Sequence, residues 1–107
     1  MPTTATLVST IEQAAARLAD AVVAETALED ARITAKLAAI DRIMAAGDNN
    51  FTGKPHSFSS AESMVNTDDD YQTYLERQRN AMRDRIIARG AYDAAVAAVR
   101  LQGDGHG

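Results

Sequence analysis

A polar stretch near the middle of the chain holds most of the side chains that could do chemistry. Residues 49–60 gather a lysine, a histidine, several hydroxyl groups and two aromatic rings. In such a stretch a glycine lets backbone amides approach an anion, a lysine supplies positive charge, and histidine and hydroxyl groups donate hydrogen bonds. We therefore predict a site for a phosphate-bearing ligand in this stretch.

The ligand contacts are expected from the stretch itself and from the aromatic residue that begins the next long helix. The lysine, histidine and serine side chains would contact phosphate, while Phe51 or Tyr71 would pack against a base. The predicted ligand-binding residues are Phe51, Thr52, Gly53, Lys54, His56, Ser57, Ser59 and Tyr71.

An ordinary connection between helices is the competing interpretation of this stretch. Glycine, proline and serine are turn residues, so Pro55 would stiffen the chain, the serines would cap a helix and Phe58 would pin the loop. The stretch is not a P-loop, because the preceding strand and the spacing G-x-x-x-x-G-K-[ST] are absent. A connection of this length is nevertheless more often functional than a short one.

Catalysis and metal binding are not expected. The two histidines, His56 and His106, fall in the loop and in the C-terminal tail, too far apart in the chain for a simple metal site. Asp68, Asp69 and Asp70 occupy consecutive positions that point in different directions, and they compensate the positive end of a helix dipole. No activated nucleophile or paired carboxylate is recognisable. We expect no enzyme activity, no cofactor and no metal site.

A group of arginines offers a second candidate surface. Five arginines lie within residues 77–89 with few acids between them, so the segment is locally basic and could bind nucleic acid or an acidic protein surface. Alternatively, these arginines pair with acids of the first half of the chain, at Glu25, Glu29, Asp30 and Asp41. If the segment binds a partner, the contacts come from Arg77, Arg79, Arg83 and Arg85.

The composition indicates a thin helical protein. The chain has 107 residues, 46% of them hydrophobic, but alanine accounts for much of this content and only 5% are aromatic. Helix propensity is therefore high and little side-chain volume is available for burial. We expect a single helical domain over residues 1–107. The net charge of -4 argues against binding to duplex nucleic acid or anionic membranes.

Residues 4–46 are predicted to form one long helix. No glycine or proline interrupts them, and the larger apolar residues recur three or four positions apart, which places them on one helix face. Within that face an eleven-residue repeat joins Ile11, Val22, Ile33 and Met44 and would keep a nearly straight helix in register with a partner.

A second long helix is predicted over residues 68–101, with Thr67 as its N-cap and acids in its first turn. Before it, serines with capping-box spacing to a glutamate predict a short helical turn over residues 60–65. The inter-helix loop then spans residues 47–67, beginning at a glycine that can end a helix. The glycine-rich residues 102–107 are predicted to form a flexible tail.

Folded back at the loop, the two helices would form an antiparallel hairpin. Its register places Glu25 and Glu29 level with Arg85 and Arg89, so we predict that these carboxylates and guanidinium groups pair. A lone hairpin removes too little apolar surface from water to offset chain entropy. The predicted fold class is therefore an all-α two-helix hairpin that assembles as a helical-bundle homo-oligomer, most simply a dimeric four-helix bundle or else a higher oligomer.

The segment from Asn50 to Glu62, with its T-G-K-P-H-S stretch, resembles a loop between two helices in small, mostly uncharacterised phage and prophage proteins. The resemblance covers the loop and the two-helix layout. It implies a phage origin, and it brings no assigned reaction. Many small phage proteins counteract host defences, and that analogy sets the expected role.

We therefore expect a phage-type, non-enzymatic binding protein that counteracts host defence by holding a signalling nucleotide at the loop. The alternative is a helical protein–protein interaction module that blocks a host defence protein or serves as a phage structural or assembly component. Expected partners are other copies of the chain, a phosphate-bearing ligand and a host defence protein, without membranes or duplex nucleic acid. The absence of a long apolar run or secretory signal predicts a cytoplasmic protein.

Overall fold

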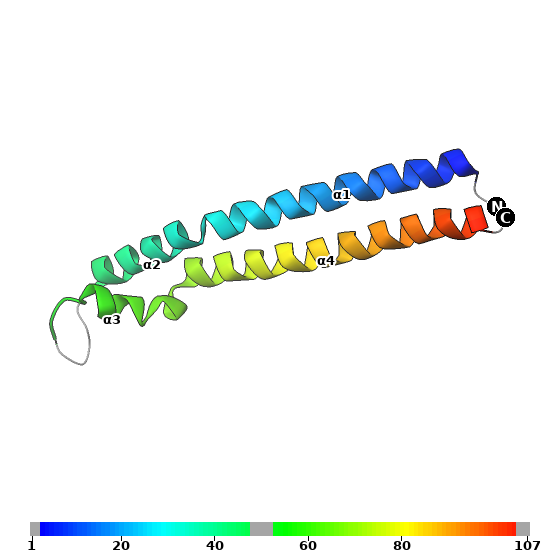
Figure 1. Cartoon of the computed structure of the whole chain (residues 1–107). Helices are drawn as coiled ribbons and strands as arrows, with labels where there is room; N and C mark the ends of the chain where they lie inside the picture. The colour runs from blue at the N-terminus through cyan, green and yellow to red at the C-terminus, as the bar shows by residue number, and fades with distance from the viewer. Residues whose placement is uncertain (1–2, 48–52, 105–107) are drawn as a thin grey trace. The chain divides into compact units, whose positions relative to one another are not determined.

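The computed structural model describes residues 3–47 and 53–104, and the order of its helices can be followed in Figure 1. These residues contain helices and turns but no β-strand, which confirms the predicted all-α class. None of the described helices combines the length and hydropathy needed to cross a membrane. The elements are α1 (Thr4–Asp30), α2 (Arg32–Ala46), α3 (Phe58–Glu62), the 3₁₀ turn η1 (Val65–Thr67) and α4 (Asp69–Asp104).

The predicted single helix over residues 4–46 is divided at Ala31 into α1 and α2. The Ala31 backbone N–H still donates to the Ala27 carbonyl at 3.1 Å, and the Ala31 carbonyl accepts from Ala35 N–H at 2.9 Å. The interruption is therefore a single turn residue with hydrogen bonds on both sides. Neither glycine nor proline marks it, so residue types gave no signal for the break.

The short helical turn also differs from the prediction. Instead of spanning 60–65, α3 begins at Phe58, and η1 follows it as a separate turn. Ser57, in an extended conformation, is the N-cap, because its hydroxyl accepts the Ser60 backbone N–H at 3.1 Å. The predicted start of the short helix, at residue 60, therefore lies two residues after the observed start at Phe58.

Helix α4 begins one residue later than predicted, and Asp68 rather than Thr67 is its N-cap. The Tyr71 backbone N–H donates to Asp68 Oδ2 at 2.8 Å. The Thr67 hydroxyl instead donates to the Met64 backbone carbonyl at 2.6 Å. At its other end α4 continues to Asp104. Residues 102–104 of the predicted tail belong to this helix, and residues 105–107 lie outside the described part.

The chain falls into two compact units, and each is described by itself. The terminal unit comprises Met1–Thr26 and Asn80–Gly107, so it contains most of α1 and the larger part of α4. The central unit comprises Ala27–Arg79, with the end of α1, all of α2, α3 and η1, and the start of α4.

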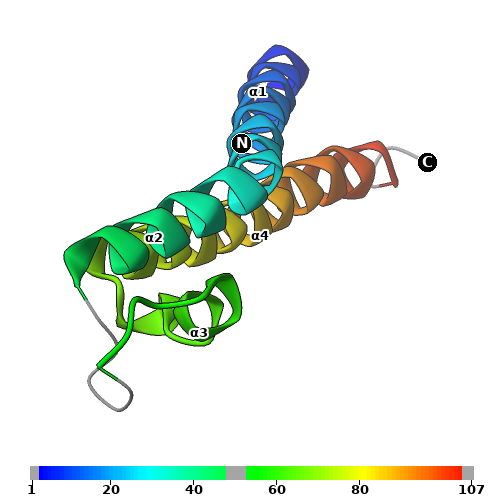
Figure 2. The ribbon, with the colours of Figure 1, turned by 90° about the vertical axis from the view of Figure 1, so that its left-hand side faces the viewer.

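The central unit has a core of large side chains. Helix α3 and the turn η1 lie against α2, as Figures 1 and 2 show. Ile40 of α2 is 1% exposed and is the largest fully buried side chain among the described residues. Tyr71 and Tyr74 of α4 stack with ring centres 6.0 Å apart. The buried cluster consists of Ala39, Ile40, Ala61, Val65, Tyr71 and Tyr74.

One hydrogen bond links this core to the end of α1. The Tyr74 hydroxyl donates to the Leu28 backbone carbonyl, so the buried phenol has a partner for its polar end. Burial raises the pKa of the Tyr74 phenol, with a further contribution from the neighbouring Tyr71. The hydroxyl therefore stays protonated and keeps its role as a donor.

The terminal unit has a different kind of seam, because its less exposed positions recur at alternating gaps of three and four residues. This heptad spacing is typical of coiled-coil packing. Only alanines are buried there among the described residues: Ala14, Ala81 and Ala95. The positions with this spacing are Leu7, Ile11, Ala14, Leu18, Ala21 and Glu25 on α1, and Ala81, Arg85, Ala88, Tyr92, Ala95 and Val99 on α4. On α4, Val96, Ala98 and Gln102 are also less exposed.

The eleven-residue repeat does not form a buried face among the described residues, and its register with a partner stays a prediction. Val22, Ile33 and Met44 expose 41%, 71% and 42% of their surface, and of the repeat only Ile11 is half-buried. In the terminal unit the heptad positions are half-buried or buried instead. The apolar face read from the sequence was therefore wider than the seam that the helices use.

The predicted charge pairing is confirmed for one pair. Arg85 Nε donates to the Glu25 carboxylate within the terminal unit. Arg89 departs from the prediction, because its guanidinium binds Asp93, four residues further along α4, at 3.3 Å. A charged pair thus replaces apolar residues at one heptad position of each helix.

Candidate functional site

The first part of the predicted site is the polar chain that leads into α3. Gly53 has a φ of 65°, a left-handed conformation that glycine adopts without strain. Lys54, Ser57 and Ser59 are exposed, and His56 is half-buried. The structure therefore brings five of the eight predicted ligand-binding residues into one short segment at the start of α3.

Two hydrogen bonds organise this segment. His56 Nδ1 lies 2.9 Å from Ser60 Oγ, and the Ser57 hydroxyl accepts the Ser60 backbone N–H. Ser60 was not among the predicted residues, although both His56 and Ser57 contact it. Its position four residues after His56, at the start of a helix, was the signal that could have found it. The Ser57 hydroxyl caps α3, which is the role that the competing interpretation gave to the serines.

The remaining predicted ligand-binding residues do not join this segment. Phe51 and Thr52 lie outside the described residues. Tyr71 is 8% exposed and stacks on Tyr74 in the core of the central unit. Its ring therefore serves packing and is not presented to a ligand.

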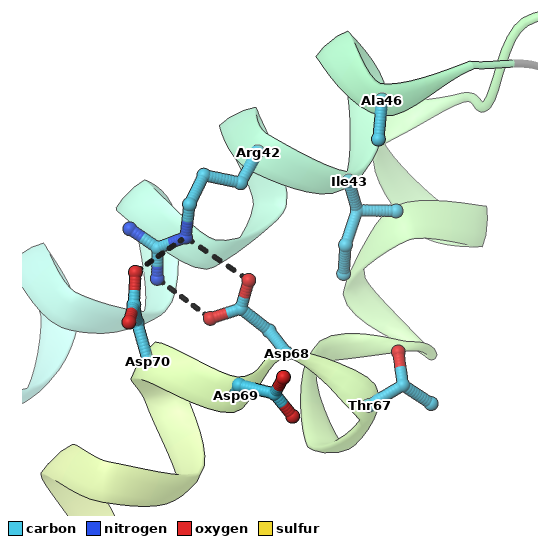
Figure 3. A pocket seen from close by; sticks show the side chains of 7 residues that line it. All are labelled: Arg42, Ile43, Ala46, Thr67, Asp68, Asp69 and Asp70. Carbon is cyan, nitrogen blue, oxygen red and sulfur yellow. Dashed lines mark hydrogen bonds and ion pairs between the residues drawn. The ribbon is translucent and has the colours of Figure 1, made fainter.

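The strongest polar contact of the central unit joins α2 to the start of α4. Arg42 Nε donates to Asp68 Oδ1 at 3.0 Å, and an Arg42 terminal nitrogen donates to Asp68 Oδ2 at 2.6 Å. This two-pronged geometry is the strong form of an arginine–carboxylate pair. Asp70 lies further away, 3.8 Å from Arg42 Nε (Figure 3). Sequence reasoning missed this pair, because it read Asp68 only as compensation of the helix dipole.

The electrostatics of the pair follow from its geometry. The hydrogen bond from Arg42 lowers the pKa of the Asp68 carboxyl; partial burial opposes the shift, and the Tyr71 N–H supports it. The same hydrogen bond raises the pKa of the Arg42 guanidinium. Asp68 is therefore ionised at neutral pH while it caps α4 and holds α2.

A surface hollow of about 440 Å³ surrounds this pair (Figure 3). Arg42 and Asp68 satisfy each other there, and Asp69 and Asp70 add negative charge, so the hollow does not favour a phosphate. In the part of the chain that the structure describes, no group of three or more His, Cys, Asp or Glu side chains is arranged to hold a metal ion. The lining residues are Arg42, Ile43, Ala46, Thr67, Asp68, Asp69 and Asp70.

A second ion pair ties α2 to α3. Lys36 Nζ lies 3.4 Å from a Glu62 carboxylate oxygen, and both side chains are more than two-fifths exposed. An exposed pair of this kind contributes little to stability.

The arginines of α4 are not equivalent in the structure. Arg77, Arg79 and Arg83 are exposed, whereas Arg85 is half-buried and bound to Glu25. Arg85 has the internal acidic partner that the alternative predicted, and the other three present positive charge to solvent.

Exposed apolar side chains are the largest feature that sequence reasoning under-weighted. On α2, Ile33, Leu37 and Met44 are exposed, as are Phe58 of α3 and Met64 just before η1. The terminal unit exposes a comparable set. It consists of Val8, Val22, Val23, Met82, Ile86, Ile87 and Leu101.

No protein-family model, no curated protein and no solved structure matches this chain. The interpretation of these surfaces therefore depends on the charge and hydrophobicity of their own side chains.

Proposed function

We propose that the chain is a non-enzymatic helical protein-interaction module that works as an assembly of identical copies. One observation carries the proposal. Among the described residues, the buried side chains larger than alanine are Ile40, Val65, Tyr71 and Tyr74, whereas twelve large apolar side chains are exposed. Exposed apolar surface that forms a contiguous patch marks a site of protein interaction.

The architecture that we propose for each copy is an antiparallel hairpin of α1–α2 with α4. The Glu25–Arg85 ion pair and the heptad spacing on both helices support it. A seam of alanines removes little apolar surface from water, because each buried methyl-sized group stabilises the fold by only about 0.8 kcal/mol. Such a hairpin needs further cover, which a helical-bundle oligomer supplies.

The mass of the chain in solution tests this proposal. Sedimentation equilibrium of the full chain is expected to give a multiple of the 11.4 kDa chain mass, and the melting temperature is expected to rise with protein concentration. A monomer at every concentration, unfolding cooperatively at one temperature, would contradict it.

The origin and the wider partner remain predictions from the resemblance to phage proteins. An acidic protein surface is the partner that Arg77, Arg79 and Arg83 favour, because these guanidinium groups are exposed. Capture of a host protein by the chain, lost in an Arg79→Glu, Arg83→Glu variant and kept in an Arg17→Glu variant, would support this role. The Arg17 change alters the same charge on α1, away from the arginine group.

A nucleotide ligand at the loop is the second candidate. Its support is the left-handed Gly53 and the adjacent Lys54, His56 and Ser60, which place backbone amides and polar side chains in one short segment. Thermal shift with a panel of cyclic and linear nucleotides tests it. The candidate requires a shift that Lys54→Ala abolishes and Arg17→Ala preserves, and a flat panel would remove it.

A further inference from the structure

The two sides of α1 in the terminal unit differ in polarity. Each residue that directly follows a heptad position of the seam lies on one side of the helix, and each residue that directly precedes one lies on the other side. The following residues are exposed, mostly apolar or small, and form what we call the α1 flank: Val8, Glu12, Ala15, Ala19, Val22 and Thr26. The preceding residues are exposed and polar apart from one alanine: Thr6, Thr10, Gln13, Arg17, Asp20 and Ala24.

Helix α4 continues the apolar side of α1. The residues that follow its heptad positions form what we call the α4 flank: Met82, Ile86, Arg89, Asp93, Val96 and Arg100. In the antiparallel hairpin proposed above, the α1 flank and the α4 flank lie on the same side and make one surface. Val8, Val22, Met82 and Ile86 expose 44%, 41%, 46% and 55% of their surface there. Among the described residues of the terminal unit, this side is apolar on both helices.

The two flanks carry complementary charges. On the α4 flank, Arg89 binds Asp93 within the helix at 3.3 Å, which leaves Arg100 as the remaining cation. On the α1 flank, Glu12 is the one charged residue. Neither Glu12 nor Arg100 has a hydrogen bond or ion pair with any residue that the structure describes. A partner that presents an acid to Arg100 and a base to Glu12 would therefore match this surface.

A surface hollow of about 360 Å³ lies on the α4 flank beside Arg100. Among the described residues it is lined by α4 alone, so α1 of the same chain does not fill it. The hollow therefore leaves room for the small side chains of another helix. Its lining residues are Arg89, Tyr92, Asp93, Val96, Ala97 and Arg100.

We propose that a second copy of this chain covers this surface, with α1 of each copy packed antiparallel on α4 of the other. The inference rests on the proposed function, because it names the surface and the arrangement of self-association. A two-fold axis along the helices produces this arrangement and keeps every residue at its level. Counted from the Glu25–Arg85 pair, Glu12 lies thirteen residues back and is level with Ala98, thirteen residues on. The partner's Glu12 therefore lies beside Arg100, and symmetry repeats the contact.

The alternative two-fold arrangement lacks this complementarity. An axis across the helices would pack α1 on the partner's α1 and α4 on the partner's α4. Glu12 would then face an α1 flank without a basic residue, and Arg100 would face an α4 flank whose one acid, Asp93, already binds Arg89. In the proposed arrangement each helix is also antiparallel to both of its neighbours, as in an up-and-down four-helix bundle. Charge and helix direction thus favour α1 on α4.

A lysine placed on the α1 flank tests the surface. Ala19→Lys is expected to raise the dissociation constant of the dimer by about tenfold or more in sedimentation equilibrium, because an ammonium group would enter an apolar interface. Ala24→Lys is the matched control, since Ala24 is an exposed alanine on the polar side of the same helix. It should leave the constant unchanged within about twofold. Equal effects of the two variants in a chain of oligomeric mass would overturn this interface and leave the proposed function standing.

Single cysteines test the arrangement, since the chain contains no cysteine of its own. Ala15 and Val96 lie at nearly the same level of the two flanks, so an Ala15→Cys chain and a Val96→Cys chain should link across the dimer under mild oxidation. With one chain enlarged by a tag, the mixed product is expected to exceed both products of equal chains. Preferential linkage of Ala15→Cys chains to each other would place α1 on α1 and overturn the proposed arrangement.

Charge exchange tests the contact between Glu12 and Arg100. Glu12→Lys and Arg100→Glu are each expected to weaken dimerisation about fivefold, because two contacts per dimer become repulsive. The double variant Glu12→Lys, Arg100→Glu should restore the wild-type dissociation constant. Arg17→Glu is the control, since it reverses a charge on the polar side of α1, and it should leave the constant unchanged. Two independent losses in place of restoration would overturn the contact. A monomeric mass for the wild-type chain at every concentration would overturn the proposed function itself.

Discussion

The central and terminal units of this chain bury different kinds of side chain. The central unit packs an isoleucine, a valine and two tyrosines against alanines, and its Arg42–Asp68 pair joins α2 to α4. In the terminal unit the buried residues among those described are all alanine, and one ion pair, Glu25–Arg85, crosses the seam. Both units expose large apolar side chains.

The difference shows where the chain depends on a partner. Burial of an isoleucine or an aromatic side chain stabilises a fold by about 1.5–3 kcal/mol relative to exposure, and an alanine contributes far less. The central unit therefore has a core of its own, while the terminal unit is expected to be ordered chiefly by association. Hydrogen exchange should accordingly slow down in the terminal unit, more than in the central unit, as protein concentration rises.

The largest effect is expected from emptying the central core. Ile40→Ala removes the most deeply buried large side chain, and the resulting cavity should lower the free energy of unfolding by about 2–5 kcal/mol. Chemical denaturation followed by circular dichroism measures the loss. Ile87→Ala is the matched control, because Ile87 is 62% exposed in the terminal unit. Similar losses in both variants would contradict the contrast between the units.

The second effect concerns the polar contact of the central unit. Asp68→Asn keeps the size of the side chain but removes the ionised partner of Arg42 and weakens the cap of α4. We expect a loss of about 1–2 kcal/mol in the free energy of unfolding. Asp69→Asn changes the same charge at the next, exposed position and should cost less than half as much. Indistinguishable variants would mean that the contact with Arg42 contributes nothing.

The pH dependence of stability should carry the same signature. The folded chain lowers the pKa of Asp68 below its ordinary value of 3.8, so its contribution is complete above that value and is lost as the pH falls through the folded value. The stability difference between wild type and Asp68→Asn should therefore be largest near about pH 7 and shrink toward about pH 2. A difference that stays constant across this range would show that ionisation of Asp68 does not matter.

The smallest effect is expected at the ion pair of the terminal unit. Arg85 and Glu25 are 38% and 23% exposed, so solvent screens their attraction, and Arg85→Ala should cost about 0.5–1 kcal/mol. Arg89→Ala removes a more exposed pair with Asp93 and should cost less. A double-mutant cycle of Glu25 with Arg85 isolates the pair. A coupling free energy of zero would remove the charged pair as a determinant of register.

Helix class, the stop at Gly47 and the Glu25–Arg85 pair could be predicted from the sequence, because propensity, turn residues and charge spacing are local signals. The exposed Ile33 could not be distinguished from the buried Ile40, since both are equally apolar and only packing by α3 and η1 covers Ile40. For the candidate site, the grouping of Lys54, His56 and Ser57 followed from their closeness in the chain. The burial of Tyr71 and the reach of Arg42 to Asp68 depend on tertiary contacts that no local pattern encodes.

The double role of Asp68 has a consequence for folding. One carboxylate both caps the first turn of α4 and receives the guanidinium of Arg42, twenty-six residues earlier in the chain. Two events that are independent in most helical proteins, the nucleation of one helix and the docking of another, here share a single side chain. The start of α4 should therefore form late and together with the arrival of α2, so its amide protons report the completion of the central unit.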